Sequence, residues 1–293
     1  MIVPCTIPDK LIVFVTFYYN PNRIKELKYA VSQVPYYANS VELHIVTNED
    51  SVKDLLTFEG VYNTTVSVHV IKDDVNHPHY FGWFHLTLLR DFIKKGNECT
   101  HVLHMEDDVL IKPQLIYTLT SMLKAIGNET GSDFIPGTVR VEQAGYSPIL
   151  SKQKRELGKW YACDQVRHTV LDEVSYLTGP INLLVPLDNP HQGFYFLDRP
   201  KISRLIEVGF DIPYYNLNKQ LDHGLLRERA VAGLTYDNPP ENFIHKTVVW
   251  VDKDTLKIPS LFHVPHLTNV SNWVDAANIS EILVDEVIKK SRD

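Results

Sequence analysis

Hydrophobic and polar residues follow two alternating patterns along the first half of the chain. Continuous runs of β-branched and aromatic residues are typical of strands that are buried on both faces of a parallel sheet. The run Lys10–Tyr19 is continuous and predicts such a strand, and shorter strand-like segments predict three more at Val41–Thr47, Val66–Ile71 and Thr100–Met105. The turn residues Asn20-Pro21-Asn22 end the first of them.

Between these strands, apolar residues recur with the period of an α-helix. Apolar positions spaced i, i+3, i+4, i+7, i+8 predict a helix over 83–95, and Gly96 is placed to end it. A second helix is predicted over 114–126, with Gly127 as its cap. Further helices are predicted at Arg23–Val34, Arg199–Val208 and Asn218–Ala230, and from about Ser280 onward.

The order of these elements determines the fold class. Strands that alternate with helices predict βαβ units and an α/β fold, in which helices flank a mainly parallel sheet. The second half is richer in turn residues, with short strands predicted at Asp133–Pro136 and Ile181–Pro186. No internal repeat or linker divides the chain, so we expect a single domain over residues 1–293.

Composition and charge exclude several classes of protein. The 293 residues carry a net charge of −7, and 44% of them are hydrophobic, which predicts a large core and excludes disorder. The acidic balance argues against a nucleic-acid partner. The apolar run Leu11–Tyr19 is too short to span a membrane and lacks the flanks of a signal peptide, so we expect a soluble chain without a transmembrane segment.

The acidic triplet Glu106-Asp107-Asp108 is the strongest candidate for chemistry. It directly follows a predicted strand, and ligands of open α/β sheets bind outside the carboxyl ends of the strands. Neighbouring carboxylates repel one another, so a cation is needed where they lie in a cleft. Mg²⁺ and Mn²⁺ prefer oxygen ligands and keep positions for phosphates. The triplet therefore predicts a metal site, and the alternative is a solvated acidic turn.

The segment HVLHMEDDVLI resembles the short acidic segment, written DxD, of GT-A type glycosyltransferases. These enzymes use nucleotide-sugar donors. The resemblance implies a Rossmann-like fold with a donor-binding half at about 10–130 and an acceptor-binding half at about 131–293. It also implies that Glu106 and Asp108 hold Mn²⁺ or Mg²⁺ against the two donor phosphates, with Asp107 in the middle on the donor. Glutamate replaces the first aspartate of the motif here.

The end of the first strand resembles the part of the family that cradles the nucleotide. The resemblance implies that Thr16 bonds to the base and that Tyr18 stacks on it. Trp83 is a further ring that offers a stacking face. The alternative for Thr16 and Tyr18 is a structural role in a core strand or in a turn.

The segment HQGFYFLDRPKISRLIEVG resembles the glycine–aromatic stretch that borders the acceptor site in the family. The resemblance implies that Gly193, Phe194 and Tyr195 line that wall. Farther along, Asp222 occupies the position at which many inverting members of the family carry the last residue of an acidic pair. This resemblance implies that Asp222 is the base that takes the proton of the acceptor hydroxyl. The alternative is an Asp that caps a helix, with Asp172 and Glu173 as other candidates for the base.

A late histidine completes the metal shell in several GT-A enzymes. His263 and His266 both fit that position, and each also fits a purely structural role. On the strand before the triplet, alternation predicts that His104, Glu106 and Asp108 lie on one face.

These observations lead to one hypothesis and three alternatives. We expect a metal-assisted glycosyltransferase that moves a sugar from a nucleoside diphosphate, UDP rather than GDP, to a hydroxyl of a glycan. Asp222 favours an inverting reaction, and a retaining one stays open. The alternatives are a nucleotidyltransferase, a glycoside hydrolase and a non-enzymatic carbohydrate-binding protein. The nucleotidyltransferase is disfavoured because the loop 18–22 contains no glycine.

Overall fold

The computed structural model describes the first half of the chain almost completely and the second half in segments. The described residues are 6–56, 61–72, 81–82, 84–96, 98–129, 134–144, 160–162, 182–186, 193–207, 246–252 and 258–269. Some of the residues and elements predicted above lie outside these ranges, namely Trp83, Asp172, Glu173, Asp222, the helix at 218–230 and the helix from about 280.

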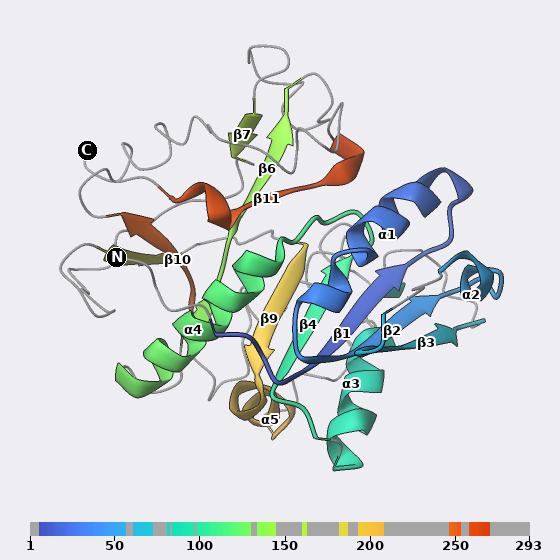
Figure 1. The fold of residues 1–293 in the computed structure, drawn as a ribbon, viewed down its shortest axis with the longest axis horizontal. Helices are drawn as coiled ribbons and strands as arrows, with labels where there is room; N and C mark the ends of the chain where they lie inside the picture. The colour runs from blue at the N-terminus through green and yellow to red at the C-terminus, as the bar shows by residue number, and fades with distance from the viewer. Residues whose placement is uncertain are drawn as a thin grey trace, which may run out of the picture.

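A five-stranded sheet forms the centre of the fold, with the strand order β3-β2-β1-β4-β9 (Figure 1). Four strands run parallel and β9 runs antiparallel to β4. The bounds are Lys10–Phe17 for β1, Ser40–Thr47 for β2, Thr64–Val70 for β3, His101–Glu106 for β4 and Phe194–Asp198 for β9. The four predicted strands and the predicted α/β class with a mainly parallel sheet are thus confirmed.

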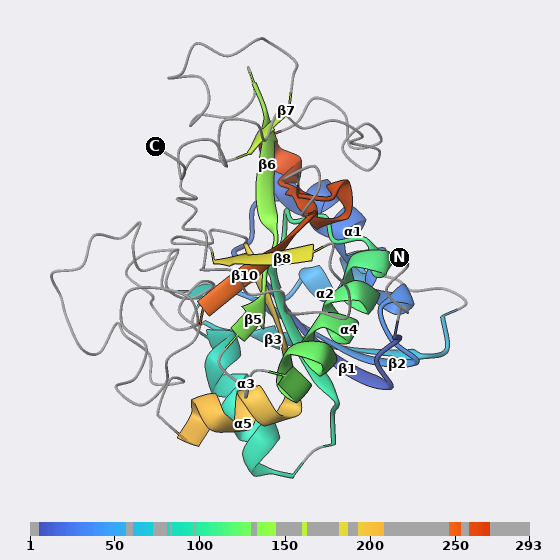
Figure 2. The ribbon, with the colours of Figure 1, turned by 90° about the vertical axis from the view of Figure 1, so that its left-hand side faces the viewer.

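Helices cover both faces of this sheet (Figures 1 and 2). On one face lie α1 (Ile24–Val31) and α4 (Pro113–Glu129), and on the other lie α3 (Phe84–Lys94) and α5 (Arg199–Glu207). The short α2 (Val52–Leu55) follows β2. Each of the longer helices presents an apolar stripe to the sheet, which is the arrangement that period-3.6 patterning predicts.

Strand β1 shows why both faces are covered. Its side chains alternate, so that Leu11, Val13 and Val15 join the core cluster under α1 and α4. Ile12 and Phe14 point the opposite way and join the cluster that contains residues of α3 and α5. All five are completely buried or nearly so. A strand buried on both sides needs the continuous apolar run seen in the sequence.

Two smaller sheets complete the described fold. One has the order β5-β10-β8 and the other the order β11-β6-β7. Their bounds are Phe134–Pro136 for β5, Lys246–Asp252 for β10, Asn182–Pro186 for β8, His263–Pro265 for β11, Val139–Gln143 for β6 and Trp160–Ala162 for β7. Single 3-10 turns lie at Pro21–Arg23, Val34–Tyr36, Ser260–Phe262 and Leu267–Asn269. In Figure 1 the β11-β6-β7 sheet lies beyond the carboxyl end of β4.

Helix ends differ from the prediction at two places. The helix α4 continues through Gly127 to Glu129, so the predicted cap at Gly127 is wrong. A helix interior tolerates one glycine at a cost of about 1 kcal/mol relative to alanine. The helix predicted over Arg23–Val34 is shorter, because α1 ends at Val31 and Pro35 then lies in a 3-10 turn. Gly96 does end α3, with φ of +72°.

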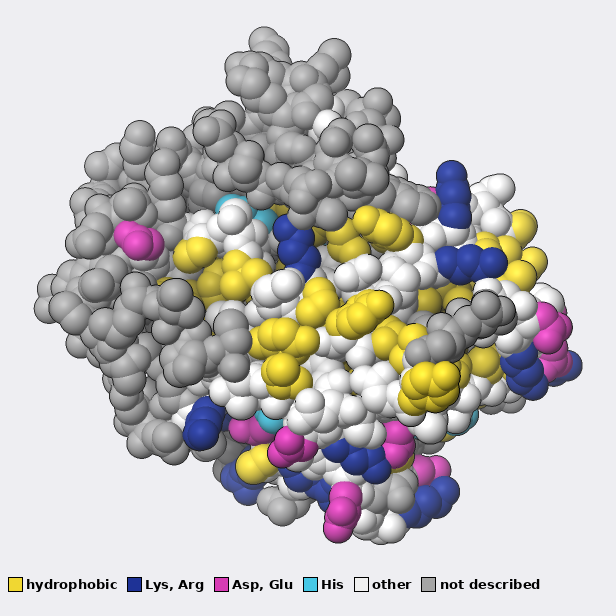
Figure 3. Space-filling model, viewed as in Figure 1, with side chains coloured by type: hydrophobic (Ala, Val, Ile, Leu, Met, Phe, Trp, Pro, Cys, Tyr) yellow, Lys and Arg dark blue, Asp and Glu magenta, His cyan; other side chains and the backbone are white. Residues whose placement is uncertain are grey.

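The outer surface of the α1 and α4 face is shown in Figure 3. Apolar side chains are spread over the middle of this face, and charged side chains gather mainly along its lower and right-hand edges. Among the described residues, we find no helix that combines the length and the apolar character needed to cross a membrane.

Gly193, the residue before β9, provides a test of the packing at the carboxyl end of β4. Its φ is +70°, and a Cβ atom there would lie 2.7 Å from Val109 Cγ2 and 2.8 Å from His266 Nε2. We therefore expect Gly193→Ala to lower the free energy of unfolding by about 2–4 kcal/mol, through backbone strain and overpacking. Urea unfolding measures this change.

Gly96→Ala is the matched control, because Gly96 also has a left-handed φ but no atom lies within 4 Å of the position that its Cβ atom would take. Strain alone should then cost about 1 kcal/mol. Equal losses for the two variants would contradict close packing at Gly193.

Candidate metal centre

The acidic triplet lies where the central sheet ends. Glu106 is the last residue of β4, and Asp107 and Asp108 form the turn that follows. The register pairs Glu106 with Thr16 near the end of β1, the parallel neighbour of β4. The loop after β1 therefore meets the triplet at the carboxyl edge of the sheet, where α/β proteins bind their ligands.

Backbone hydrogen bonds fix this turn against two distant parts of the chain. The amide of Glu106 donates to the carbonyl of Gly193 at 2.8 Å, just before β9. The carbonyl of Asp108 accepts a hydrogen bond from the amide of Leu267 at 2.7 Å, and the Leu110 amide donates to the Pro265 carbonyl at 3.1 Å. These bonds bring the segment 263–269 alongside the triplet.

Three side chains from these segments converge into a group that can bind a divalent metal. Glu106, Asp108 and His266 each offer one ligand atom, and these atoms all lie within 4.8 Å of one another. The exposed fractions are 5% for Glu106, 3% for Asp108 and 1% for His266. Two carboxylates and an imidazole suit a divalent ion, and such a group at this spacing requires little movement to surround one.

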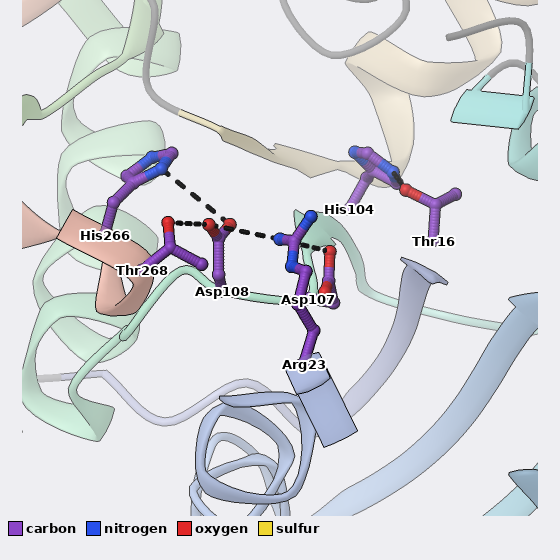
Figure 4. A network of polar contacts seen from close by, with 7 residues as sticks. All are labelled: Thr16, Arg23, His104, Asp107, Asp108, His266 and Thr268. Carbon is purple, nitrogen blue, oxygen red and sulfur yellow. Dashed lines mark hydrogen bonds and ion pairs between the residues drawn. The ribbon is translucent and has the colours of Figure 1, made fainter. Parts of the chain in front are cut away.

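Asp108 holds the central position in this group (Figure 4). Its Oδ2 atom accepts a hydrogen bond from the Thr268 hydroxyl at 2.7 Å. Its Oδ1 atom lies 3.8 Å from His266 Nδ1 and has no hydrogen-bond partner among the described residues. The buried Nε2 atom of His266 likewise has no hydrogen-bond partner among the described residues. Buried polar atoms are costly without a partner, and a cation at Oδ1 would supply one.

The protonation states also favour a cation. Burial, assisted by the positive charge of Arg140, lowers the pKa of His266 to about 4, so the imidazole is neutral at pH 7. Burial acts to raise the pKa of Asp108, but the groups around the carboxylate hold it below its usual value: His266 where its imidazole is protonated, the Arg23 guanidinium, and the Thr268 hydrogen bond. The group thus offers an ionised carboxylate and a neutral imidazole, which are the forms that bind metals.

The middle residue of the triplet, Asp107, does not join the three candidate ligands. Its Oδ1 atom forms an ion pair of 2.9 Å with Arg23 Nη2, and the same nitrogen lies 3.1 Å from Asp108 Oδ2. Burial and the nearby charge of Asp108 raise the pKa of Asp107 well above its usual value, and the Arg23 guanidinium opposes this shift.

His104 of β4 and Thr16 of β1 contact each other through their side chains. His104 Nε2 lies at hydrogen-bond distance, 3.2 Å, from the Thr16 hydroxyl, and its ring stacks on His85 with 3.6 Å between centroids. Both residues are buried. His104 is therefore absent from the group formed by Glu106, Asp108 and His266, and the Thr16 hydroxyl faces another protein side chain.

The other predicted contact residues divide into buried and exposed ones. Phe194 and Tyr195 are both buried within core clusters, and the Tyr195 hydroxyl lies 2.9 Å from His85 Nε2. Both rings are almost completely buried as placed, and their expected place along an acceptor wall stays a prediction. Tyr18 is 41% exposed at the end of β1, and its ring meets Phe81 edge-on at 5.7 Å.

The structure distinguishes between the two late histidines. His266 belongs to the three-residue group, whereas His263 lies outside it. His263 is buried, and its pKa is lowered to about 4 by burial and by Lys112.

Sequence reasoning missed two members of the site, Arg23 and Thr268. Arg23 could have been found from its place in the loop after β1. Parallel neighbouring strands end at the same edge of a sheet, so this loop and the triplet after β4 lie close together. Nothing in the sequence singles out Thr268, because its role depends on a backbone pairing between segments that are distant in the chain.

The site and the fold define an α/β protein with a candidate divalent-cation centre at the carboxyl edge of its main sheet. No model of a known protein family matches the chain, and no curated protein matches it.

Metal binding can be tested without any substrate. We expect the chain to bind Mn²⁺, and we expect Asp108→Asn and His266→Asn each to weaken binding by more than 10-fold. Loss of a residue that only orients a metal ligand typically costs at least about 10-fold in metal affinity, so loss of a ligand itself should cost more. Titration calorimetry measures the affinities. His263→Asn is the matched control, because it removes a buried imidazole outside the group. Equal losses for the two histidine variants would contradict this ligand set.

Proposed function

We propose that this chain is a metal-dependent glycosyltransferase with a GT-A type fold, which transfers a sugar from a nucleoside diphosphate to a hydroxyl of a glycan. One observation carries the proposal: Glu106, Asp108 and His266 converge at the carboxyl edge of a mainly parallel sheet, next to the end of β1. The segment that supplies two of these ligands is also the one that resembles the DxD segment.

The donor set fits Mn²⁺ or Mg²⁺. Two carboxylates and one imidazole give a mainly oxygen shell and leave coordination positions for phosphate oxygens. When bound, such a cation stabilises the negative charge that grows on the departing diphosphate. The Thr268 hydroxyl orients Asp108 through its Oδ2 atom, so that Oδ1 is the oxygen directed toward His266.

The donor side of the site is supported by the end of β1. Tyr18 is exposed there and offers a ring on which a nucleobase can stack. Asp107, the middle acid of the triplet, is the candidate partner for the donor sugar or ribose. Thr16 supports this side indirectly, because its buried contact with His104 packs the strand end beneath the triplet.

In our proposal the acceptor side of the site begins at Gly193, the residue before β9. Gly193 packs against His266 and Val109, so the start of β9 lies directly beside a candidate metal ligand. Asp222 is our candidate for the base of an inverting reaction, in which one carboxylate takes the proton of the acceptor hydroxyl. Asp172 and Glu173 are the alternative bases.

A panel of nucleotide sugars tests the proposal. We expect UDP-sugars, or else GDP-sugars, to raise the melting temperature only when Mn²⁺ is present, and we expect release of the nucleoside diphosphate in the presence of a glycan acceptor. Asp108→Asn should reduce turnover by at least about 100-fold, because it removes charge from the centre that stabilises the leaving group. Asp50→Asn, which changes an exposed carboxylate, is the control.

Two results would contradict the proposal. One is a protein that binds Mn²⁺ but binds no nucleotide or nucleotide sugar with it. The other is an Asp108→Asn variant that keeps near-normal turnover.

Asp222→Asn separates the chemical step from donor binding. We expect donor affinity to stay within about twofold and turnover to fall by about 100-fold or more, as for loss of a general base. Calorimetry and a product assay measure the two quantities. Normal turnover in this variant would remove Asp222 from the mechanism and direct the same experiment to Asp172 and Glu173.

A further inference from the structure

We propose that Arg23 is a resident counter-ion of the acidic triplet, which competes with the divalent cation for Asp108 and thereby couples binding of the cation to binding of the diphosphate. The identity of the diphosphate ligand rests on the proposed function. The competition with the cation follows from the contacts of Arg23 alone.

The contacts of Arg23 place one positive charge on two carboxylates (Figure 4). A single nitrogen, Nη2, lies 2.9 Å from Asp107 Oδ1 and 3.1 Å from Asp108 Oδ2. Because a guanidinium stays protonated at every accessible pH, this charge is permanent. Two nearly buried carboxylates in adjacent positions need such a charge when no other cation neutralises them.

Arg23 and the candidate cation site share Asp108 from opposite sides. The guanidinium contacts the Oδ2 atom, whereas His266 faces the Oδ1 atom, and Figure 4 shows the two side chains on either side of this carboxylate. A divalent ion held by Glu106, Asp108 and His266 therefore lies close to the guanidinium. The two positive charges repel each other in a poorly solvated place, so each lowers the affinity of the site for the other.

Arg23 retains unused hydrogen-bonding capacity for an anion. Its Nε atom is buried and has no hydrogen-bond partner among the described residues, although the side chain as a whole is 28% exposed. The guanidinium fork matches the oxygens of a phosphate better than a single ammonium does. A diphosphate bound to the cation would bring such oxygens to this side chain and offset the contact that it loses at Asp108.

The backbone at Arg23 is fixed, so only the side chain has to move. The Arg23 amide donates to the Asn20 carbonyl at 2.9 Å, and the Asn20 side chain accepts from the Asn22 amide at 3.0 Å. Pro21 further restricts this turn. A long side chain on a rigid turn can exchange one carboxylate for a phosphate without any rearrangement of the fold.

Coupling follows from these contacts. Without diphosphate, Arg23 disfavours the cation, and with diphosphate the same charge favours the ternary complex. Each ligand must then tighten the other by the same factor. We therefore expect low occupancy of the site by the cation until the diphosphate of the donor binds.

Arg23→Met tests the proposal because the two affinities should change in opposite directions. For Mn²⁺ alone, we expect about three- to tenfold tighter binding, because a nearby positive charge is gone. For UDP or GDP in saturating Mn²⁺, we expect about ten- to a hundredfold weaker binding, because charge-assisted hydrogen bonds are lost. A purely structural role for Arg23 would weaken both. Titration calorimetry gives both affinities.

Two further variants complete the experiment. Arg23→Lys keeps the charge but not the fork, so its affinity for Mn²⁺ alone should match the wild type while its affinity for the nucleotide falls. Lys28→Met removes an exposed charge from α1, the helix that follows Arg23, and should change neither affinity. If Arg23→Met does not fold, Arg23→Gln replaces it, since the amide still donates to the two carboxylates.

Unchanged or weaker binding of Mn²⁺ alone in the Arg23→Met or Arg23→Gln variant would overturn the proposal. A wild-type protein that binds Mn²⁺ but neither nucleotide contradicts the proposed function instead. In that case the measurement with Mn²⁺ alone still decides whether Arg23 competes with the cation.

Discussion

The burial of three consecutive carboxyl groups at the end of β4 is the constraint on which the rest of this site depends. Adjacent acids repel, and loss of water raises the cost of their charge. The positive charge of Arg23 offsets part of this cost, and the Thr268 hydroxyl donates a hydrogen bond to Asp108. The third neighbour, His266, is a neutral imidazole at pH 7. This arrangement still leaves Asp108 Oδ1 without a hydrogen bond among the described residues. A divalent cation is the ligand that best completes it.

The fold supplies the convergence that this site requires. Parallel strands β1 and β4 end at the same edge, which places the loop of Arg23 beside the triplet. Antiparallel β9 then brings Gly193 to the same edge, where only a glycine fits between Val109 and His266. The segment 263–269 returns to pair with the turn after β4. Two distant parts of the chain thus meet the end of β4 through backbone hydrogen bonds, and the loop after β1 reaches it through the Arg23 side chain.

The sequence predicts the parts of this structure that depend on local patterns. The strand β1 follows from an unbroken run of apolar and β-branched residues, β2 to β4 follow from shorter strand-like segments, and the position of the triplet follows from the segment before it. The choice of His266 over His263 does not follow, because it depends on the pairing of Leu267 with Asp108. The burial of Tyr195 depends on its contact with His85, a residue 110 positions away. Gly127 does not end α4, because one glycine costs too little to stop a well-packed helix.

The central claim is that Glu106, Asp108 and His266 hold a divalent cation at which a nucleoside diphosphate binds. Anomalous diffraction from crystals grown with Mn²⁺ and UDP, or with Mn²⁺ and GDP, tests it most directly. The account predicts one Mn²⁺ peak in contact with all three side chains, with the diphosphate on the ion and the Arg23 guanidinium turned toward a phosphate. An Mn²⁺ ion bound elsewhere, with Asp108 still contacting only Arg23 and Thr268, would contradict it.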